Sequence, residues 1–164
     1  MPKIFPIVGF FVLLWHAAFV RVQYSHYIDP RDMERGKLVV EYELATRSPS
    51  IIWNMIGTAA GLQKWMADDV QEENGEMTFT WGNTWAQHDT RTAKVVAVDK
   101  LRRIRLKWDY IEADYAYLEI RIEKSEITGM CHLVITDFAE ADDIDDLRCL
   151  WADNLDRLHQ VSGL

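Results

Sequence analysis

The sequence predicts an α+β domain in which one antiparallel sheet precedes a long C-terminal helix. Two patterns carry this prediction. Apolar and polar residues alternate with period two in a series of short segments separated by turn signals, which is typical of hairpin-connected strands. From residue 142 onward, the apolar residues instead recur at helical intervals behind an acidic first turn.

The composition limits the classes of function. The chain has 164 residues, which fits a single domain with a sizeable core. Hydrophobic residues make up 49% and aromatic residues 12%, including seven tryptophans, so the chain is too apolar to be disordered. The formal net charge of −8 argues against nucleic-acid partners and disfavours an anionic membrane surface. Cys131 and Cys149 match no metal-binding spacing, and we expect two reduced thiols in a cytoplasmic protein.

A strand and two short helices open the domain. KLVVEYELAT, residues 37–46, alternates in the manner of a half-buried strand. In SPSIIWNMIGTAAGLQKWMADD, residues 48–69, Ser48-Pro49 starts a helix, Gly57 ends it, and Thr58 caps a second one. The interruption predicts a helix-turn-helix connector with its large apolar residues on a common side: Trp53, Leu62 and Trp65.

Six strand candidates then follow at hairpin spacing between residues 69 and 138. Asn74-Gly75 is typical of a tight hairpin turn, and Phe79 and Trp81 alternate with threonines after it. The same alternation recurs in four later segments, at residues 85–98, 101–110, 113–124 and 130–138. Consecutive hairpins predict an antiparallel sheet. The final helix, from about residue 142, carries these apolar residues at helical spacing: Ile144, Leu147, Leu150, Trp151, Leu155 and Leu158.

Several motifs resemble those of the START/SRPBCC superfamily. SPSIIWNMIGTAAGLQKWMA is similar to the entry motif of that superfamily, with Ser-Pro, a tryptophan in the first helix, a Gly-Leu pair and then Trp65. TFTW, ITDFAEADD and the closing LWADNLDRLH also look like its members. In particular, residues 37–162 are similar to the branch named for activators of the heat-shock chaperone ATPase.

The resemblance implies a helix-grip fold, in which a curved antiparallel sheet of about seven strands wraps around the long C-terminal helix and leaves a cleft between them. Members bind lipids, sterols, polyketides or other apolar ligands, while some are cyclases and some contact chaperones. We therefore expect a non-enzymatic START-like domain over residues 37–164 that binds a small apolar ligand, lipid-like or polycyclic. The alternative is a protein-interaction or chaperone-associated module that uses its acidic surface, and an enzyme is a third hypothesis.

Large apolar side chains from separate elements form the candidate ligand site. In a helix-grip they would converge on the cleft between the sheet and the final helix: Trp65, Phe79, Trp81, Trp108, Phe138, Leu147 and Trp151. Two interpretations stay open, a packed aromatic core and an aromatic-walled ligand cleft. The ligand cleft remains competitive because a packed core seldom needs so many indoles. Each indole that is buried in a core needs a hydrogen-bond partner for its N–H group.

The sequence offers no catalytic constellation. His88-Asp89 and Cys131-His132 are each neighbours on a predicted strand, where adjacent side chains point to opposite faces. Asp137 and the acidic residues 140–146 suggest a metal site, yet they lack the spacing of a calcium loop. We therefore expect no catalytic residues, no metal and no cofactor.

The first 36 residues comprise an apolar segment and a linker. IFPIVGFFVLLWHAAFV, residues 4–20, leaves three interpretations open: a misassigned start with translation from Met33, an uncleaved membrane anchor, and a cleaved signal peptide. Basic residues are more numerous after this segment than before it, which would keep an anchored domain on the cytoplasmic side. We expect a cytoplasmic domain, with a form anchored in the inner membrane as the alternative.

Overall fold

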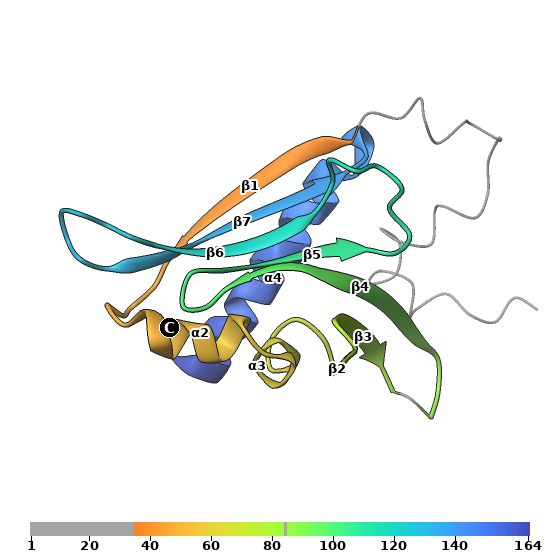
Figure 1. Cartoon of the computed structure of the whole chain (residues 1–164), viewed down its shortest axis with the longest axis horizontal. Helices are drawn as coiled ribbons and strands as arrows, with labels where there is room; N and C mark the ends of the chain where they lie inside the picture. Colours follow the sequence, from red (N-terminus) through yellow and green to blue (C-terminus); the bar gives the residue numbers. More distant parts are fainter. Residues whose placement is uncertain (1–34, 84) are drawn as a thin grey trace, which may run out of the picture.

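The computed structural model describes residues 35–83 and 85–164. Seven strands form one antiparallel sheet in the order β1-β7-β6-β5-β4-β3-β2 (Figure 1). The strands are β1 (Gly36–Glu43), β2 (Asp69–Glu73), β3 (Glu76–Gly82), β4 (His88–Asp99), β5 (Arg103–Trp108), β6 (Leu118–Lys124) and β7 (Cys131–Ala139). The helices of the described residues are α2 (Pro49–Ile56), α3 (Ala59–Gln63), the 3-10 turn η3 (Ala141–Asp143) and α4 (Ile144–Ser162).

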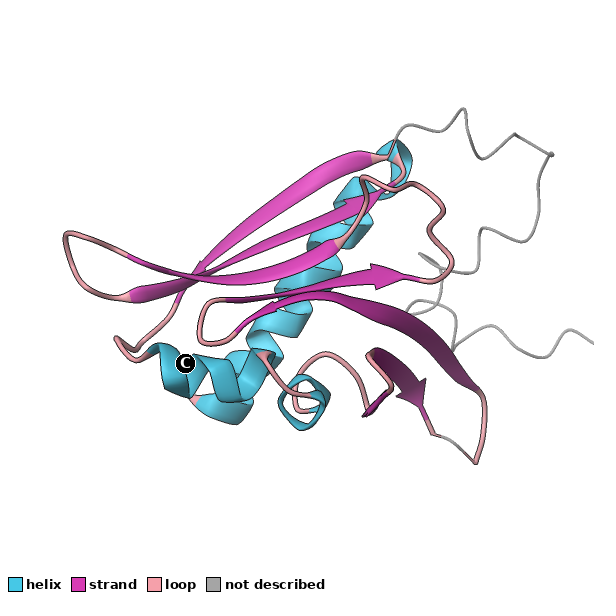
Figure 2. Cartoon of the chain, viewed as in Figure 1, coloured by secondary structure: helices cyan, strands magenta, loops and turns pink. Residues whose placement is uncertain are grey.

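This arrangement confirms the predicted helix-grip. The sheet bends around α4, which crosses its concave face (Figure 2). β1 joins the edge of the sheet by pairing with β7, although it comes first in the chain. The alternation predicted for β5 is also present, because Ile104, Leu106 and Trp108 are buried while the basic residues between them are partly exposed.

The tight turn between β2 and β3 sets the register of that hairpin. Asn74 and Gly75 both have positive φ angles, of 53° and 81°. This combination is what a two-residue type I′ turn requires, and its twist matches that of the flanking strands. The turn pairs Glu73 with Glu76, which places Val70 opposite Phe79 on the same face of the sheet.

The interruption between α2 and α3 lets the second helix fold back on the first. Thr58 caps α3, since its hydroxyl accepts a hydrogen bond from the Gly61 amide at 3.0 Å. Gly61 lies so close to α2 that a Cβ atom there would be 2.9 Å from the Met55 backbone and would overlap the Asn54 carbonyl oxygen. The predicted break is therefore a packing requirement. At the start of α2, Ser48 occupies the N-cap position but makes no side-chain cap hydrogen bond.

Three predicted strands differ from the observed ones at their ends. The strand expected over residues 113–124 begins only at Leu118, because Asp114 and Tyr115 form a turn before it. The first strand was expected over residues 37–46, but β1 ends at Glu43. The long strand expected from residue 85 begins only at His88. The reason lies in Asn83, whose side-chain and main-chain oxygens accept hydrogen bonds from the amides of Trp85 (2.9 Å) and Ala86 (2.8 Å). This local turn draws Trp85 out of the ladder and leaves it 94% exposed.

The interpretations of residues 4–20 and of a start at Met33 lie outside the described residues. Within residues 35–83 and 85–164, no helix has the length and apolar character needed to cross a membrane.

Replacement of Gly61 by alanine tests the close approach of α2 and α3. Alanine favours helices over glycine by up to about 1 kcal/mol, but overpacking against backbone costs on the order of 1–3 kcal/mol or more. We expect Gly61→Ala to lower the free energy of unfolding in chemical denaturation, whereas Ala60→Ser, in the exposed part of the same helix, changes it by less than about 1 kcal/mol. A Gly61→Ala protein as stable as the parent would contradict the close packing.

Candidate functional site

Four aromatic rings form a continuous series on the concave face, which we call the aromatic strip: Phe79, Trp81, Trp108 and Tyr110. Ring centroids lie 6.0 Å apart for Phe79 and Trp81 and 5.2 Å apart for Phe79 and Trp108. Trp108 continues the series to Tyr110 at 6.0 Å. Phe79 is fully buried while Tyr110 is 47% exposed, so the strip leads from the core to the surface.

A second pair of rings joins the helical elements. The centroids of Trp65 and Trp151 are 6.3 Å apart, and both side chains are buried. Trp65 donates its indole N–H to the Met55 carbonyl at 2.9 Å, and Trp151 donates to Asp137 Oδ2 at 2.9 Å. Trp81 of the aromatic strip likewise donates to the Met66 carbonyl at 2.7 Å. These indoles therefore have the partners that packed tryptophans need.

The structure brings together five of the seven predicted site residues in these two groups: Trp65, Phe79, Trp81, Trp108 and Trp151. Leu147 is partly buried against the same core. Phe138 is also partly buried against the core, but its ring contacts are with other residues than those of the two groups. It follows the inward-facing Asp137 on β7, so strand alternation turns it to the other face, where its ring contacts Tyr115 at 5.9 Å and Tyr117 at 5.3 Å.

Arg91 lies over the exposed end of the aromatic strip. Its guanidinium carbon is 5.2 Å from the centroid of the Tyr110 ring and 6.0 Å from that of Trp81. Asp89 forms an ion pair with it at 2.9 Å. A cation over ring faces is favourable, and the carboxylate fixes its position, so this end of the strip is both aromatic and polar.

Asp137 is a buried carboxylate on the concave face, only 7% exposed. Its Oδ1 accepts a hydrogen bond from the Phe138 amide at 2.8 Å, and its Oδ2 accepts the one from Trp151. Burial raises the pKa of Asp137 to about 6. These two hydrogen bonds and the positive charge of Arg35 oppose the shift. Carboxylates whose pKa is raised toward neutral pH are common at functional sites.

Tyr110 lies near enough to Arg91 and Asp137 for both charges to affect its pKa. Burial raises the pKa of Tyr110, the Arg91 guanidinium opposes this, and the Asp137 carboxylate adds to it. The polar groups and the exposed end of the aromatic strip therefore belong to one region of the concave face.

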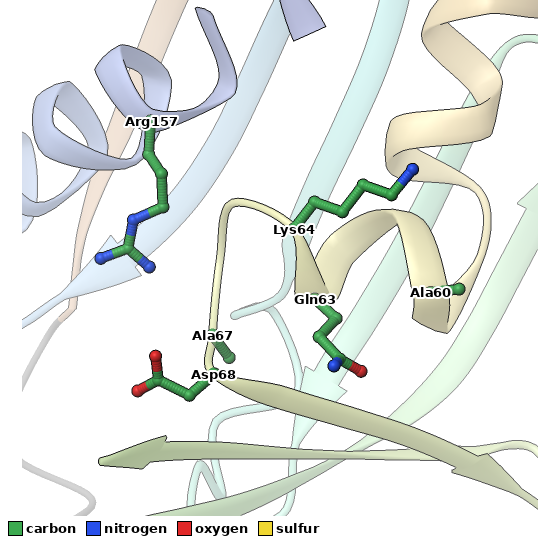
Figure 3. Close-up of a pocket in the computed structure, with 6 residues that line it drawn as sticks. All are labelled: Ala60, Gln63, Lys64, Ala67, Asp68 and Arg157. Carbon is green, nitrogen blue, oxygen red and sulfur yellow. The ribbon is translucent and has the colours of Figure 1, made fainter. Parts of the chain in front are cut away.

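A hollow of about 490 Å3 lies elsewhere, between α3 and α4. Figure 3 shows Arg157 and Asp68 facing one another across it, while the Lys64 side chain extends away from both. Its lining consists of small or polar residues: Ala60, Gln63, Lys64, Ala67, Asp68 and Arg157. None of the predicted site residues takes part. This hollow therefore lacks the apolar walls expected of a site for an apolar ligand.

The predicted ligand site omits three members of the region, Arg91, Tyr110 and Asp137, of which the sequence singles out Asp137 only as a candidate metal ligand. The sequence could have placed Tyr110 on the inward face, because it continues the inward alternation of Ile104, Leu106 and Trp108. No local pattern predicts the position of Arg91, since its place opposite Phe79 depends on the register between β3 and β4.

Residues 32–164 match the family model of the START-like superfamily domain. The chain belongs to the START-like superfamily. No curated protein matches the sequence.

Solved structures with the same fold support this membership. A Bacteroides fragilis protein solved by NMR in solution is 38% identical, with a TM-score of 0.53, over 79% of this chain and 92% of its own. The Aha1 dimer of Colwellia psychrerythraea is 16% identical, with a TM-score of 0.56, over 79% and 96% of the two chains. An AHSA1 protein of Silicibacter pomeroyi is 19% identical, with a TM-score of 0.57, over 75% and 94%. The last two structures show that the fold is shared.

The pH dependence of stability tests the burial of Asp137. Its pKa is about 6 in the folded chain and about 3.9 when unfolded, so folding favours the protonated form. Its contribution to stability therefore rises as the pH falls through 6 and is complete below about 3.9. From pH 7.5 to 4.5, we expect the parent to gain about 2 kcal/mol relative to Asp137→Asn in urea denaturation. A constant difference between the two proteins would contradict the buried carboxylate.

Proposed function

We propose that this chain is a non-catalytic START-like binding domain that holds a small, mostly apolar ligand against the aromatic strip, between the concave face of the sheet and α4. One observation carries the proposal. The strip is continuous from the buried Phe79 to the half-exposed Tyr110, so an apolar molecule at its outer end extends the core rather than meeting an isolated ring. Apolar walls with a few polar groups are the usual composition of a ligand site.

The area that such a ligand buries is enough for useful affinity. Removal of apolar surface from water contributes roughly 25 cal/mol for each Å2, so a ligand that buries about 300 Å2 gains on the order of 7 kcal/mol. Loss of translational and rotational freedom offsets part of this gain. Affinity in the micromolar range is therefore physically reasonable without a charged contact.

The contacts of Cys131, His132 and His88 support a non-catalytic role. Among the described residues, Cys131 is fully buried and His132 points to the opposite face of β7, where it lies 3.4 Å from Glu123. The exposed His88 lies 3.1 Å from the Ala86 carbonyl through Nδ1. These contacts provide no nucleophile with an adjacent base, which covalent catalysis would need.

A protein-interaction module is the second candidate, and the satisfied indole N–H groups favour it. Rings that already pack against one another need no ligand to complete the core. The outer face of α4 also exposes four acidic residues, Asp145, Asp146, Asp153 and Asp156, which suit a basic partner. This candidate requires no opening of the aromatic strip.

Tryptophan replacements separate the two candidates. We expect Trp81→Ala to weaken binding of a fluorescent sterol probe at least fivefold, because the half-buried ring lies toward the outer part of the strip. Trp151→Ala should instead cost about 3–5 kcal/mol of stability, as for a tryptophan within a core. Probe titration and urea denaturation of the same proteins measure both effects.

Trp85→Ala is the matched control, because this ring is 94% exposed and makes no contact with the strip. Trp85→Ala should change neither the affinity for the sterol probe nor the free energy of unfolding. A parent protein that binds no sterol probe, together with a loss of several kcal/mol in Trp81→Ala, would assign the strip to the core and leave the interaction module as the function.

A further inference from the structure

Two buried carboxylates occupy opposite faces of the sheet and have different surroundings. Glu119, on the convex face, is 3% exposed and is surrounded by three guanidinium groups. Arg105 lies 2.7 Å from it, Arg121 3.3 Å and Arg103 3.4 Å. Asp137, on the concave face, is 7% exposed and forms no ion pair with any described residue.

A buried carboxylate without a counter-ion opposes folding at neutral pH, whereas a neutral acceptor would not. The two donors that meet Asp137 are uncharged: the Phe138 amide and the Trp151 indole. Orientation of Trp151 alone does not call for a charge, since an amide oxygen accepts an N–H equally well. A carboxylate has about four acceptor positions, so Asp137 retains capacity for further donors.

The neighbouring charged groups are compensated by other residues. Arg91 pairs with Asp89. The charge of Arg35 lowers the pKa of Asp137, but its ion pair is with Glu140, at 3.6 Å. Asp137 acts on the pKa of Tyr110, at the exposed end of the aromatic strip, and it contacts Trp151 on α4. The spare acceptor capacity of Asp137 is thus close to where the proposed apolar ligand would lie.

We propose that Asp137 selects the polar end of the ligand: the site takes an apolar molecule that ends in a hydrogen-bond donor, such as a hydroxyl or amine, and excludes one that ends in a carboxylate. This inference rests on the proposed function. A donor would use the free acceptor positions of Asp137, while a second carboxylate beside it would add like-charge repulsion at a desolvated place. Specificity then comes from rejection of acids as much as from attraction of donors.

Ligands with the same chain and different ends test the selection. Displacement of the sterol probe at pH 7.5 by 1-decanol and by decanoate compares a hydroxyl with a carboxylate on equal apolar chains. We expect the parent to bind decanol at least tenfold more tightly than decanoate. In Asp137→Asn this ratio should fall at least fivefold, mainly because decanoate binds better.

Asp114→Asn is the matched control. It makes the same chemical change and removes the same charge, but Asp114 is fully exposed and pairs with Lys107 at 2.9 Å. Its ratio of decanol to decanoate affinity should equal that of the parent. This result would separate a local effect of Asp137 from an effect of the overall net charge of −8. An unchanged ratio in Asp137→Asn would overturn the selection while leaving ligand binding intact. A parent that binds neither the sterol probe nor decanol would overturn the proposed function and this inference together.

Discussion

The contact between Trp65 and Trp151 ties the three helical elements to the sheet. Each indole is buried and has one N–H that must be paired. Trp65 pairs its N–H with Met55 of α2, and Trp151 pairs its own with Asp137 of β7. Since the two rings also touch, the connector after β1, the C-terminal helix and the last strand are held in one arrangement. The close approach at Gly61 is part of the same constraint, because it brings Met55 within reach of Trp65.

This arrangement decides where a ligand or partner can act. α4 packs against β1 and β7 at one side of the sheet, and α3 packs against β2 at the other. The aromatic strip lies on β3 and β5 and just beyond β5, between these two supports in the strand order. The two faces of the sheet also differ in chemistry. The convex face pairs its buried carboxylate with arginines. The concave face combines aromatic rings with Asp137, which is hydrogen-bonded but forms no ion pair with a described residue.

Local patterns in the sequence were sufficient for the order of the elements and the antiparallel sheet, whereas the helix-grip followed from the resemblance to the START/SRPBCC superfamily. Strand alternation, the Asn-Gly turn and the caps around Gly57 each act within a few residues, so they can be recognised without knowing the fold. Most of the aromatic set could also be predicted, because large apolar side chains on inward positions converge in any helix-grip. Phe138 is among the predicted site residues, although inward Leu133 and Ile135 imply by alternation that Asp137 faces inward and Phe138 does not. The positions of Arg91 and Asp137 relative to the strip depend on pairing between distant strands, which no local pattern encodes.

Native mass spectrometry of the protein purified from its own host tests the binding role most directly, since it weighs whatever remains bound to the folded chain. If the aromatic strip holds an apolar ligand, part of the folded population should carry an added mass of a few hundred daltons. That mass should be released by organic solvent and should be identified in the extract as an apolar molecule with a hydroxyl or amine end. A folded protein that carries only the mass of the bare chain in every charge state, and that takes up no added decanol, would contradict the binding role.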